Sequence, residues 1–272
     1  MPSASRLAHA LRHRGLPRNA RAGLLRLELA RRVRPRAAYA LPLDASTIYL
    51  SHDDYEIDWA SLAFVAVDEA YTGDYHGALI VDIGAHKGYY GAYALARGAR
   101  AVVSYEPETA NFALLERAAG AVRAWGGAWH TRRSAVGAER GEAELHVMGA
   151  SWGHALHPPE AFAEHETGVE LVRVEALADV LKEAIDLACG ARVIVKVNIE
   201  GEECPTIIGT PASAWEGIDE LYVETHPWAA CGADELARHL EPADLTRAES
   251  AHPAVLRLRR AGPRAARRSG PT

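Results

Sequence analysis

The sequence predicts an α/β fold in which a mostly parallel sheet carries a ligand site at the carboxyl ends of its strands. The first observation is residues 79–90, where an apolar run ends in Asp82 and turns at Gly84 into a helix-like stretch. The second is residues 101–107, an apolar run that ends in Glu106. Ligands bind at this edge of an open α/β sheet, so the two strand ends predict a nucleotide-type site.

The glycine turn favours S-adenosylmethionine over a dinucleotide. Gly84 and Gly88 have the spacing G-x-x-x-G, whereas dinucleotide binders have G-x-G-x-x-G, which disfavours an NAD-dependent oxidoreductase. Gly84 lets the backbone turn sharply and lets a ligand approach closely. The helix that starts near Gly88 is expected to point free N–H groups at a ligand carboxylate. Glu106 follows at about the distance at which an acidic residue binds ribose hydroxyls.

The N-terminal part is predicted to begin with a short amphipathic helix. Asn19 can cap it, Leu25, Leu29 and Val33 share one face, and Pro35 ends it. A short strand at residues 46–50 and a helix at residues 59–71 follow in the pattern. We expect this part to pack over the cleft and to contribute substrate contacts.

The rest of the chain alternates strands and helices, which is typical of a wound α/β sheet. A small β excursion is predicted at residues 142–147 and a further strand at residues 168–174. Residues 149–168 show no clean period and are long for an internal loop, so they predict a functional lid; a merely decorative insertion is the alternative. The predicted core strands are residues 79–83, 101–105, 129–133, 193–199, 221–226, 245–248 and 255–259, and the helices are residues 89–96, 111–122, 177–187 and 234–240.

Four segments stand in this order along the chain: Asp82-Ile83-Gly84-Ala85, Tyr105-Glu106-Pro107, residues 193–203 and residues 221–227. Together they resemble the FkbM family of S-adenosylmethionine-dependent methyltransferases. The resemblance covers residues 80–226 and implies a class I methyltransferase (Rossmann-like) fold. That fold is a mostly parallel seven-stranded sheet with helices on both faces, one antiparallel strand near the C-terminus and, here, an N-terminal helical extension. The resemblance also implies O-methylation of a small-molecule hydroxyl, often on a sugar or a polyketide-type natural product.

The chain departs from the family pattern at three places. His86 stands where the family commonly has Asn, Asn198 where it commonly has Asp, and residues 176–178 where it commonly has Thr-Leu-Asp. The first two changes favour an alternative, a catalytically silent S-adenosylmethionine-binding protein. The intact Glu200-Gly201 pair and the spacing of Glu224 and His226 favour an active methyltransferase.

The donor S-adenosylmethionine is expected to lie at the glycine turn and at the next two strand ends. Ser134 and Ala135 follow the third strand, where this class of enzyme often contacts adenine. The predicted cofactor-binding residues are Asp82, Gly84, Ala85, His86, Gly88, Glu106, Ser134 and Ala135.

Two polar rows lie at the ends of neighbouring strands, and we expect them to converge beside the methyl donor. Alternate residues of a strand share a face, which groups Lys196, Asn198 and Glu200 on one strand and Glu224 with His226 on the next. Parallel core strands are usually apolar on both faces, so these polar residues predict a cleft.

Methyl transfer from a sulfonium needs positioning of the acceptor and removal of its proton. His226 is the predicted base because imidazole titrates near neutrality, with Glu224 or Glu200 to orient it; a structural histidine is the alternative. Lys196 could balance the carboxylates or steady the developing alkoxide. A divalent metal held by Glu200, Glu224 and His226 is the rival; Asn198 weakens it because hard cations prefer carboxylates, so no metal is predicted.

Composition sets the remaining expectations. The 272 residues are 49% hydrophobic and 24% charged, as in a globular protein. Cys189, Cys204 and Cys231 form no C-x-x-C pair, which favours a reducing compartment. No apolar run approaches membrane-spanning length, so we predict a cytoplasmic protein without a membrane partner.

Residues 1–36 contain ten arginines and one acid, Glu28, although the whole chain has a net charge of −6. No aromatic residues interleave these arginines, which argues against single-stranded nucleic acid as a partner. The chain is predicted to divide into an N-terminal extension and cap (1–75), an S-adenosylmethionine-dependent methyltransferase domain (76–262) and a flexible tail (263–272). The sequence leaves open whether the protein forms a homo-oligomer.

Overall fold

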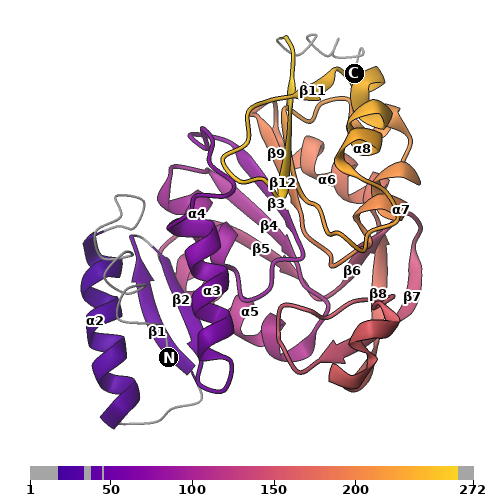
Figure 1. Cartoon of the computed structure of the whole chain (residues 1–272). Coiled ribbons are helices and arrows are strands. Elements are labelled where there is room, and N and C mark those ends of the chain that lie inside the picture. The colour runs from indigo at the N-terminus through magenta and orange to yellow at the C-terminus, as the bar shows by residue number, and fades with distance from the viewer. Residues whose placement is uncertain (1–17, 34–37, 45, 263–272) are drawn as a thin grey trace.

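A seven-stranded sheet forms the centre of the protein, as a computed structural model describes it for residues 18–33, 38–44 and 46–262 (Figure 1). Its order is β11-β12-β10-β9-β3-β4-β5, and β12 runs antiparallel to both neighbours while the other described pairs are parallel. This confirms the predicted mostly parallel sheet with one antiparallel strand near the C-terminus. The strands are β3 (Leu79–Ile83), β4 (Ala101–Tyr105), β5 (Ala128–Arg132), β9 (Val193–Val197), β10 (Glu220–Glu224), β11 (Leu245–Arg247) and β12 (Val255–Arg260).

Helices cover both faces of this sheet because successive side chains of each strand point to opposite sides. Ile80 and Val102 belong to one core cluster, whereas their neighbours Val81 and Val103 belong to the other. Burial of each such side chain contributes about 1.5–3 kcal/mol. The first cluster includes α3 (Tyr55–Ala66), α4 (Tyr89–Ala96) and α5 (Thr109–Ala124), and the second includes α6 (Leu177–Ala188), α7 (Glu203–Ile208) and α8 (Ala233–Leu240).

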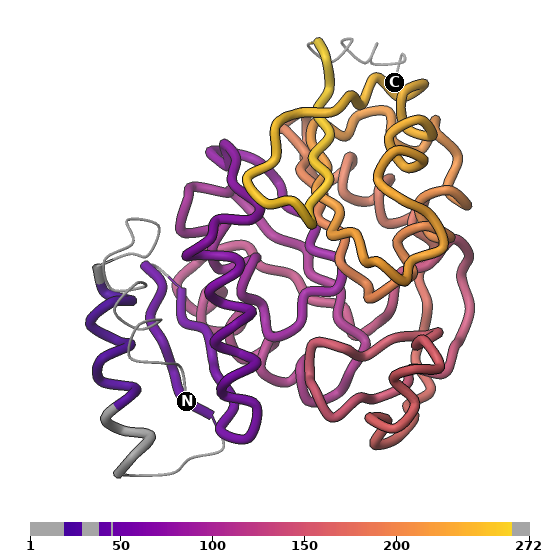
Figure 2. Tube along the Cα trace, viewed as in Figure 1, coloured from indigo at the N-terminus to yellow at the C-terminus, as the bar shows by residue number. Residues whose placement is uncertain are grey.

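The N-terminal extension contains a helix, α2 (Arg18–Val33), and an antiparallel hairpin of β1 (Ala38–Leu43) and β2 (Ser46–Ser51). Figure 2 shows this indigo segment at one side of the molecule, from which the chain continues through α3 into the sheet. Its buried side chains join the same core cluster as α4 and α5. The sequence predicted the second strand of the hairpin but not the first.

The buried face of α2 differs from the predicted one. Leu25 is 54% exposed, whereas Ala20, Leu24 and Leu27 are buried. The reason is a close approach at Gly23, where an added Cβ would lie 2.8 Å from a side-chain carbon of Pro42 in β1. That contact turns the face next to Gly23 toward the hairpin. The side chains of Leu29 and Val33, also predicted on this face, lie outside the part of the chain that the structure describes.

A second, three-stranded sheet has the order β6-β8-β7 and contains the predicted β excursion. Its strands are β6 (Ala135–Gly137), β7 (Gly141–Met148) and β8 (Glu166–Ala176). Residues 149–165, which we call the insertion, connect β7 to β8 and include the short helix η1 (Glu160–His165). No helix in the described ranges is long and apolar enough to cross a membrane. The predicted tail, residues 263–272, lies outside those ranges.

Candidate active site

A cavity of about 380 Å³ opens at the carboxyl ends of the central strands, and its volume is in the range of small-molecule sites. This is the sheet edge at which open α/β folds bind ligands. Ten predicted residues line the cavity: Gly84, Ala85, His86, Glu106, Ser134, Ala135, Lys196, Asn198, Glu200 and Glu224. Three predicted residues, Asp82, Gly88 and His226, do not line it.

Two segments outside the central sheet complete the walls of the cavity. Ala60, Ser61, Phe64 and Val65 of α3 line one part, and Ser151, Trp152 and residues 154–156 of the insertion line another. The N-terminal extension therefore reaches the cavity through α3, and the insertion reaches it as well.

A close contact between two backbones requires glycine at position 84. Gly84 has a φ of +71°, and an added Cβ would lie 1.7 Å from the backbone oxygen of Asn198. The N–H groups of Gly84 and Ala85 donate to Tyr105, and the N–H of Gly88 donates to Ala85, so these three groups are already bound. Gly88 faces the core, where an added Cβ would meet Leu115 and Trp129.

A buried ion pair supports the turn from below. Asp82 is fully buried, and its Oδ1 lies 3.2 Å from Nζ of Lys196. The same ammonium group donates to the backbone oxygens of Gly84 at 2.7 Å and Ile83 at 3.3 Å. Burial raises the pKa of Asp82, and the charge of Lys196 opposes this rise. The geometry thus makes the pair a support for the glycine turn.

Glu106 presents a carboxylate to the cavity in a fixed orientation. Its two oxygens accept hydrogen bonds from the backbone N–H groups of His86 at 2.8 Å and Glu108 at 3.0 Å. Burial raises the pKa of Glu106 to about 8, although both backbone bonds act in the opposite direction. Each oxygen has a second lone pair, so the group can still accept a hydrogen bond from a ligand hydroxyl.

Four residues that line the cavity have a buried polar atom without a hydrogen-bond partner among the described residues. These atoms are Oγ of Ser134, Nδ1 of His86, Oδ1 of Asn198 and the hydroxyl oxygen of Tyr90. Leaving such an atom unpaired costs about 1–3 kcal/mol, so each is better explained by a ligand that binds it. Together with Glu106 they offer the hydroxyl and amide-type partners that a nucleoside with an amino-acid tail requires, so S-adenosylmethionine fits the residues present.

Glu224 is held at the other end of the cavity by two neutral donors. Its Oε2 accepts hydrogen bonds from the Tyr71 hydroxyl at 2.7 Å and from Nδ2 of Asn198 at 2.9 Å. Burial, followed by the charge of Glu224, raises the pKa of Tyr71 well above its usual value. Tyr71 was not predicted as a site residue, because nothing local in the sequence connects it with a strand end 153 positions later.

His226 lies behind Glu200 and contacts two carboxylates. Its Nε2 is 3.5 Å from Oε2 of Glu200, and its Nδ1 is 3.2 Å from Oε1 of Glu203. Burial lowers the pKa of His226, but the bond to Glu203 and the charge of Glu200 outweigh this and leave the pKa raised. Burial raises the pKa of Glu200 to about 8, against the charge of His226. Glu200, and not His226, is therefore the group that faces the cavity.

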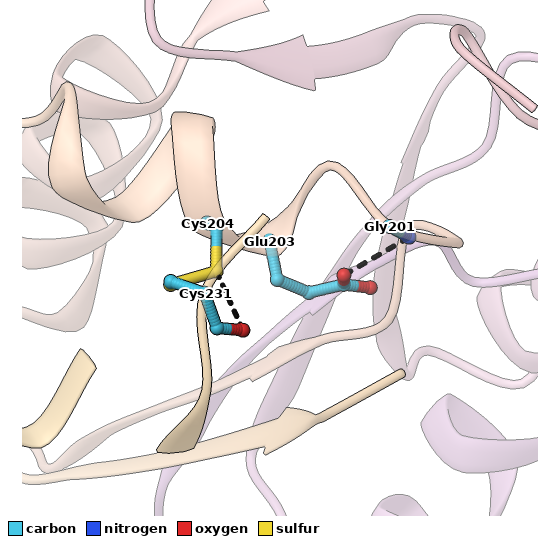
Figure 3. The surroundings of a disulfide bond; sticks show 4 residues. All are labelled: Gly201, Glu203, Cys204 and Cys231. Carbon is cyan, nitrogen blue, oxygen red and sulfur yellow. Dashed lines mark hydrogen bonds between the residues drawn. A yellow bond between two sulfur atoms is a disulfide. The ribbon is translucent and has the colours of Figure 1, made fainter. Parts of the chain in front are cut away.

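Glu203 anchors the turn that carries Glu200. Its carboxylate accepts hydrogen bonds from the N–H groups of Ile199 at 2.8 Å and Gly201 at 3.0 Å, and Figure 3 shows the second of these. The next residue, Cys204, forms a disulfide with Cys231 (Figure 3). This pairing does not fit the reducing compartment that the cysteine count and spacing had favoured; a disulfide needs no C-x-x-C spacing. Cys189 is free and exposed.

A buried polar cluster connects the extension, the glycine turn and the insertion. Nζ of Lys87 lies 2.5 Å from Oδ1 of Asp58, 3.3 Å from Oδ2 of Asp54 and 3.1 Å from Oγ of Ser151. His86 also contacts this hydroxyl, with Nε2 at 3.1 Å. Burial and then the charge of Lys87 hold the pKa of His86 well below its usual value, so this ring is neutral. The turn residues thus hold the insertion against the cavity.

The candidate metal ligands are not gathered at one point. Glu224 binds Tyr71 and Asn198, whereas His226 contacts Glu200 from behind. Within the described ranges no group of three or more His, Cys, Asp or Glu residues is arranged to hold a metal ion.

Comparison with known proteins places these features in a family. A family model described as "Methyltransferase FkbM domain" matches residues 82–253, which include all four segments named above. A comparison with curated proteins found no match.

The chain is also similar to several solved structures. The methyltransferase FkbM of Methylobacillus flagellatus KT shares 14% identity over 76% of this chain and 54% of that one, with a TM-score of 0.47. Magnesium protoporphyrin IX methyltransferase of Synechocystis PCC 6803 shares 13% identity over 76% and 79%, with a TM-score of 0.36. The 1,6-didemethyltoxoflavin-N1-methyltransferase of Burkholderia thailandensis shares 14% identity over 83% and 96%, with a TM-score of 0.34.

Proposed function

Because the chain belongs to the FkbM family of S-adenosylmethionine-dependent methyltransferases, as the sequence predicted, we propose that it methylates a hydroxyl oxygen of a small molecule. A sugar or a polyketide-type natural product is the proposed acceptor. The observation that carries this proposal is that one cavity is lined both by Glu106 and Ser134 and by Glu200 and Glu224. Residues suited to the donor and residues suited to the acceptor thus lie on one continuous surface.

The donor end of the cavity begins at the glycine turn and extends past β4 to β5. Glu106 is proposed to bind ribose hydroxyls, and Ser134 with Ala135 to lie against the adenine. Nδ1 of His86 is free to bind a polar group of the donor. Asp82 acts indirectly, because its partner Lys196 holds the turn in place. S-adenosylmethionine, when bound, supplies a methyl group on a sulfonium that needs no further activation.

Glu200 is proposed to take the proton of the acceptor hydroxyl. It faces the cavity, and its pKa of about 8 is close to neutral, where a general base is most effective. The positive charge of His226 lies behind it and favours its ionised form. Glu224 and Asn198 are placed to orient the acceptor, which is a positioning role. The sequence pattern had suggested His226 as the base and Glu200 or Glu224 as the residue that orients it. The proposal here reverses these roles: Glu200 is the base and His226 supports it.

Calorimetry tests the donor assignment. S-adenosylhomocysteine is expected to bind to the full chain, and NAD is not. Ser134→Ala should weaken the binding of S-adenosylhomocysteine by about 1 kcal/mol, because one hydrogen bond is lost. Transfer of a labelled methyl group from S-adenosylmethionine to a panel of sugars and polyketide alcohols then tests the acceptor class. Binding of NAD without binding of S-adenosylhomocysteine would contradict the proposal, and binding without transfer to any acceptor would favour the silent alternative.

The division of the chain is likewise a proposal: a cap in residues 1–75, a methyltransferase domain in residues 76–262 and a tail in residues 263–272. The lining of the cavity by α3 supports the cap. A cytoplasmic location and the oligomeric state stay predictions, which cell fractionation and light scattering test. A disulfide found in protein isolated directly from cells would argue against the cytoplasm.

A further inference from the structure

The acceptor end of the cavity points to the charge of the substrate, an inference that rests on the proposed methyltransferase function. We infer that the acceptor carries an ammonium group, which Glu224 binds beside an aromatic wall, in addition to the hydroxyl that is methylated. The acceptor would then be an amino alcohol, an amino sugar or a hydroxylated aromatic amine.

More acidic than basic side chains line the cavity. Its only lining lysine or arginine in the described ranges is Lys196, which is already bound to Asp82 and to backbone oxygens. The two lining histidines, His86 and His154, are neutral because burial lowers the pKa of each. The acidic residues that line it are Glu106 and Glu200, whose pKa burial raises to about 8, together with Glu202 and Glu224.

The acidic residues toward the acceptor end differ in whether a basic side chain lies next to them. Glu202 lies 2.8 Å from His157, and Glu200 lies 3.5 Å from His226. Glu224 has no ion pair within the described ranges; the partners given for it, Tyr71 and Asn198, are neutral. Two neutral hydrogen bonds fix the orientation of Glu224 but leave its charge available to a ligand.

An aromatic wall stands beside this carboxylate. The rings of Phe64 and Tyr71 have centroids 5.5 Å apart, and those of Tyr71 and Tyr90 are 5.2 Å apart. All three residues line the cavity, and the hydroxyl of Tyr71 connects the wall to Glu224. A carboxylate next to aromatic rings is a suitable environment for an ammonium group, since the ring faces also attract cations.

The donor does not account for the charge of Glu224. In the sheet order, β10 is followed by β9, β3 and β4, so Glu224 is three strands away from Glu106. Neighbouring strands lie about 4.8 Å apart, which separates the two strand ends by roughly 14 Å. The donor residues gather at β3, β4 and β5, and Glu224 therefore belongs to the acceptor end.

Three phenols that differ in charge test the inference on protein saturated with S-adenosylhomocysteine: tyramine, 4-ethylphenol and 3-(4-hydroxyphenyl)propanoate. Calorimetry is expected to show tyramine binding about tenfold or more tighter than 4-ethylphenol, with the propanoate weakest. The advantage of tyramine should shrink as salt is raised, because salt screens the charge of a partly exposed carboxylate.

Glu224→Gln should remove the preference for tyramine while leaving the affinity for S-adenosylhomocysteine unchanged. Glu170→Gln is the matched control, since Glu170 lies on β8 outside the cavity and binds Thr109; it should leave the preference intact. Equal affinity for the three phenols, tighter binding of 4-ethylphenol or the propanoate, or no saturable binding of tyramine would each overturn the inference. If S-adenosylhomocysteine still binds in these experiments, only the inference about the acceptor is wrong. If S-adenosylhomocysteine does not bind, the methyltransferase proposal itself is wrong.

Discussion

Gly84→Ala is expected to disrupt the donor site by displacing a neighbouring loop. Gly84 has a φ of +71°, and the new Cβ would lie 1.7 Å from the backbone oxygen of Asn198. Asn198 directly follows β9 and lies between the donor and acceptor ends of the cavity. The sequence had suggested that a side chain here would fill the ligand's space; the structure shows that it would first collide with the protein's own backbone.

The size of the effect follows from two costs. A non-glycine residue in the left-handed region costs about 1–2 kcal/mol. Real Cβ contacts are essentially never below 3.0 Å, so a contact of 1.7 Å requires the two backbones to separate by about 1.3 Å. A misplacement of about 1 Å in an active site can reduce the rate by about 10²-fold. We therefore expect Gly84→Ala to lower the unfolding free energy by about 2–4 kcal/mol. The same variant should lower turnover about 10²-fold.

Gly77→Ala separates these two costs. Gly77 has a φ of +68°, but an added Cβ there would meet nothing within 4 Å. This control should lose only the conformational part, about 1–2 kcal/mol, and keep its affinity for S-adenosylhomocysteine. Urea unfolding and calorimetry measure both quantities. If Gly84→Ala matched Gly77→Ala in stability and in affinity, the close approach of Gly84 to Asn198 would not be what the donor site depends on.

Four further outcomes are expected. Binding of S-adenosylhomocysteine at pH 7 should release protons, because ribose hydroxyls bind the charged form of Glu106, whose pKa is about 8 without the ligand. Calorimetry in buffers of different ionisation heat measures the number of protons released, which should be smaller for Glu106→Gln. Turnover should rise with pH through a limb near pH 8, the pKa of Glu200. Glu200→Gln should remove this limb, and His226→Gln should move it to higher pH because the charge of His226 lowers the pKa of Glu200. A limb that neither variant moves would rule out Glu200 as the base. Cys204→Ser should lower the unfolding free energy by about 3–4 kcal/mol, which is the loop-closure value for a disulfide that spans 27 residues. A wild-type urea midpoint that dithiothreitol leaves unchanged would show that Cys204 and Cys231 are not paired. Activity should survive EDTA, because Asn198 replaces a carboxylate; loss on chelation and recovery with magnesium would establish the metal-assisted alternative.

The parts of the site that follow strand ends could be predicted because their signals are local. An apolar run, a glycine and an acid within a few residues identify the turn at Gly84 and the carboxylate of Glu106. Strand alternation grouped Asn198 with Glu200 and Glu224 with His226, but β9 ends at Val197 and β10 at Glu224, so Asn198, Glu200 and His226 all follow their strands. Asn198 and Glu200 line the cavity nonetheless, whereas His226 does not. His226 turns instead toward Glu200 and Glu203.

Contacts between distant segments could not be predicted from one sequence. The hydroxyl of Tyr71 reaches Glu224 across 153 positions, and Lys87 reaches Asp58 across 29 positions. Asp58 lies on α3 and Tyr71 follows it, so both pairings depend on how this part of the chain packs over the sheet. Helix α3 itself begins four residues before the predicted helix. The buried Lys87 was noticeable only because lysine is rare in this chain, and that signal does not identify its partners.

Asn198 shows how a departure from the family pattern can change the electrostatics of a site without changing its shape. Its Nδ2 donates to Oε2 of Glu224 at 2.9 Å. Aspartate, the common residue of the family at this position, would place a second carboxylate at that distance, and two carboxylates so close cannot both be ionised. One of them would have to hold a proton, and the pair would carry a single charge shared between two sites. The amide supplies a donor instead, so the charge of this pair stays on Glu224. The same replacement that weakens a metal site therefore strengthens the case for a carboxylate that binds a cationic acceptor.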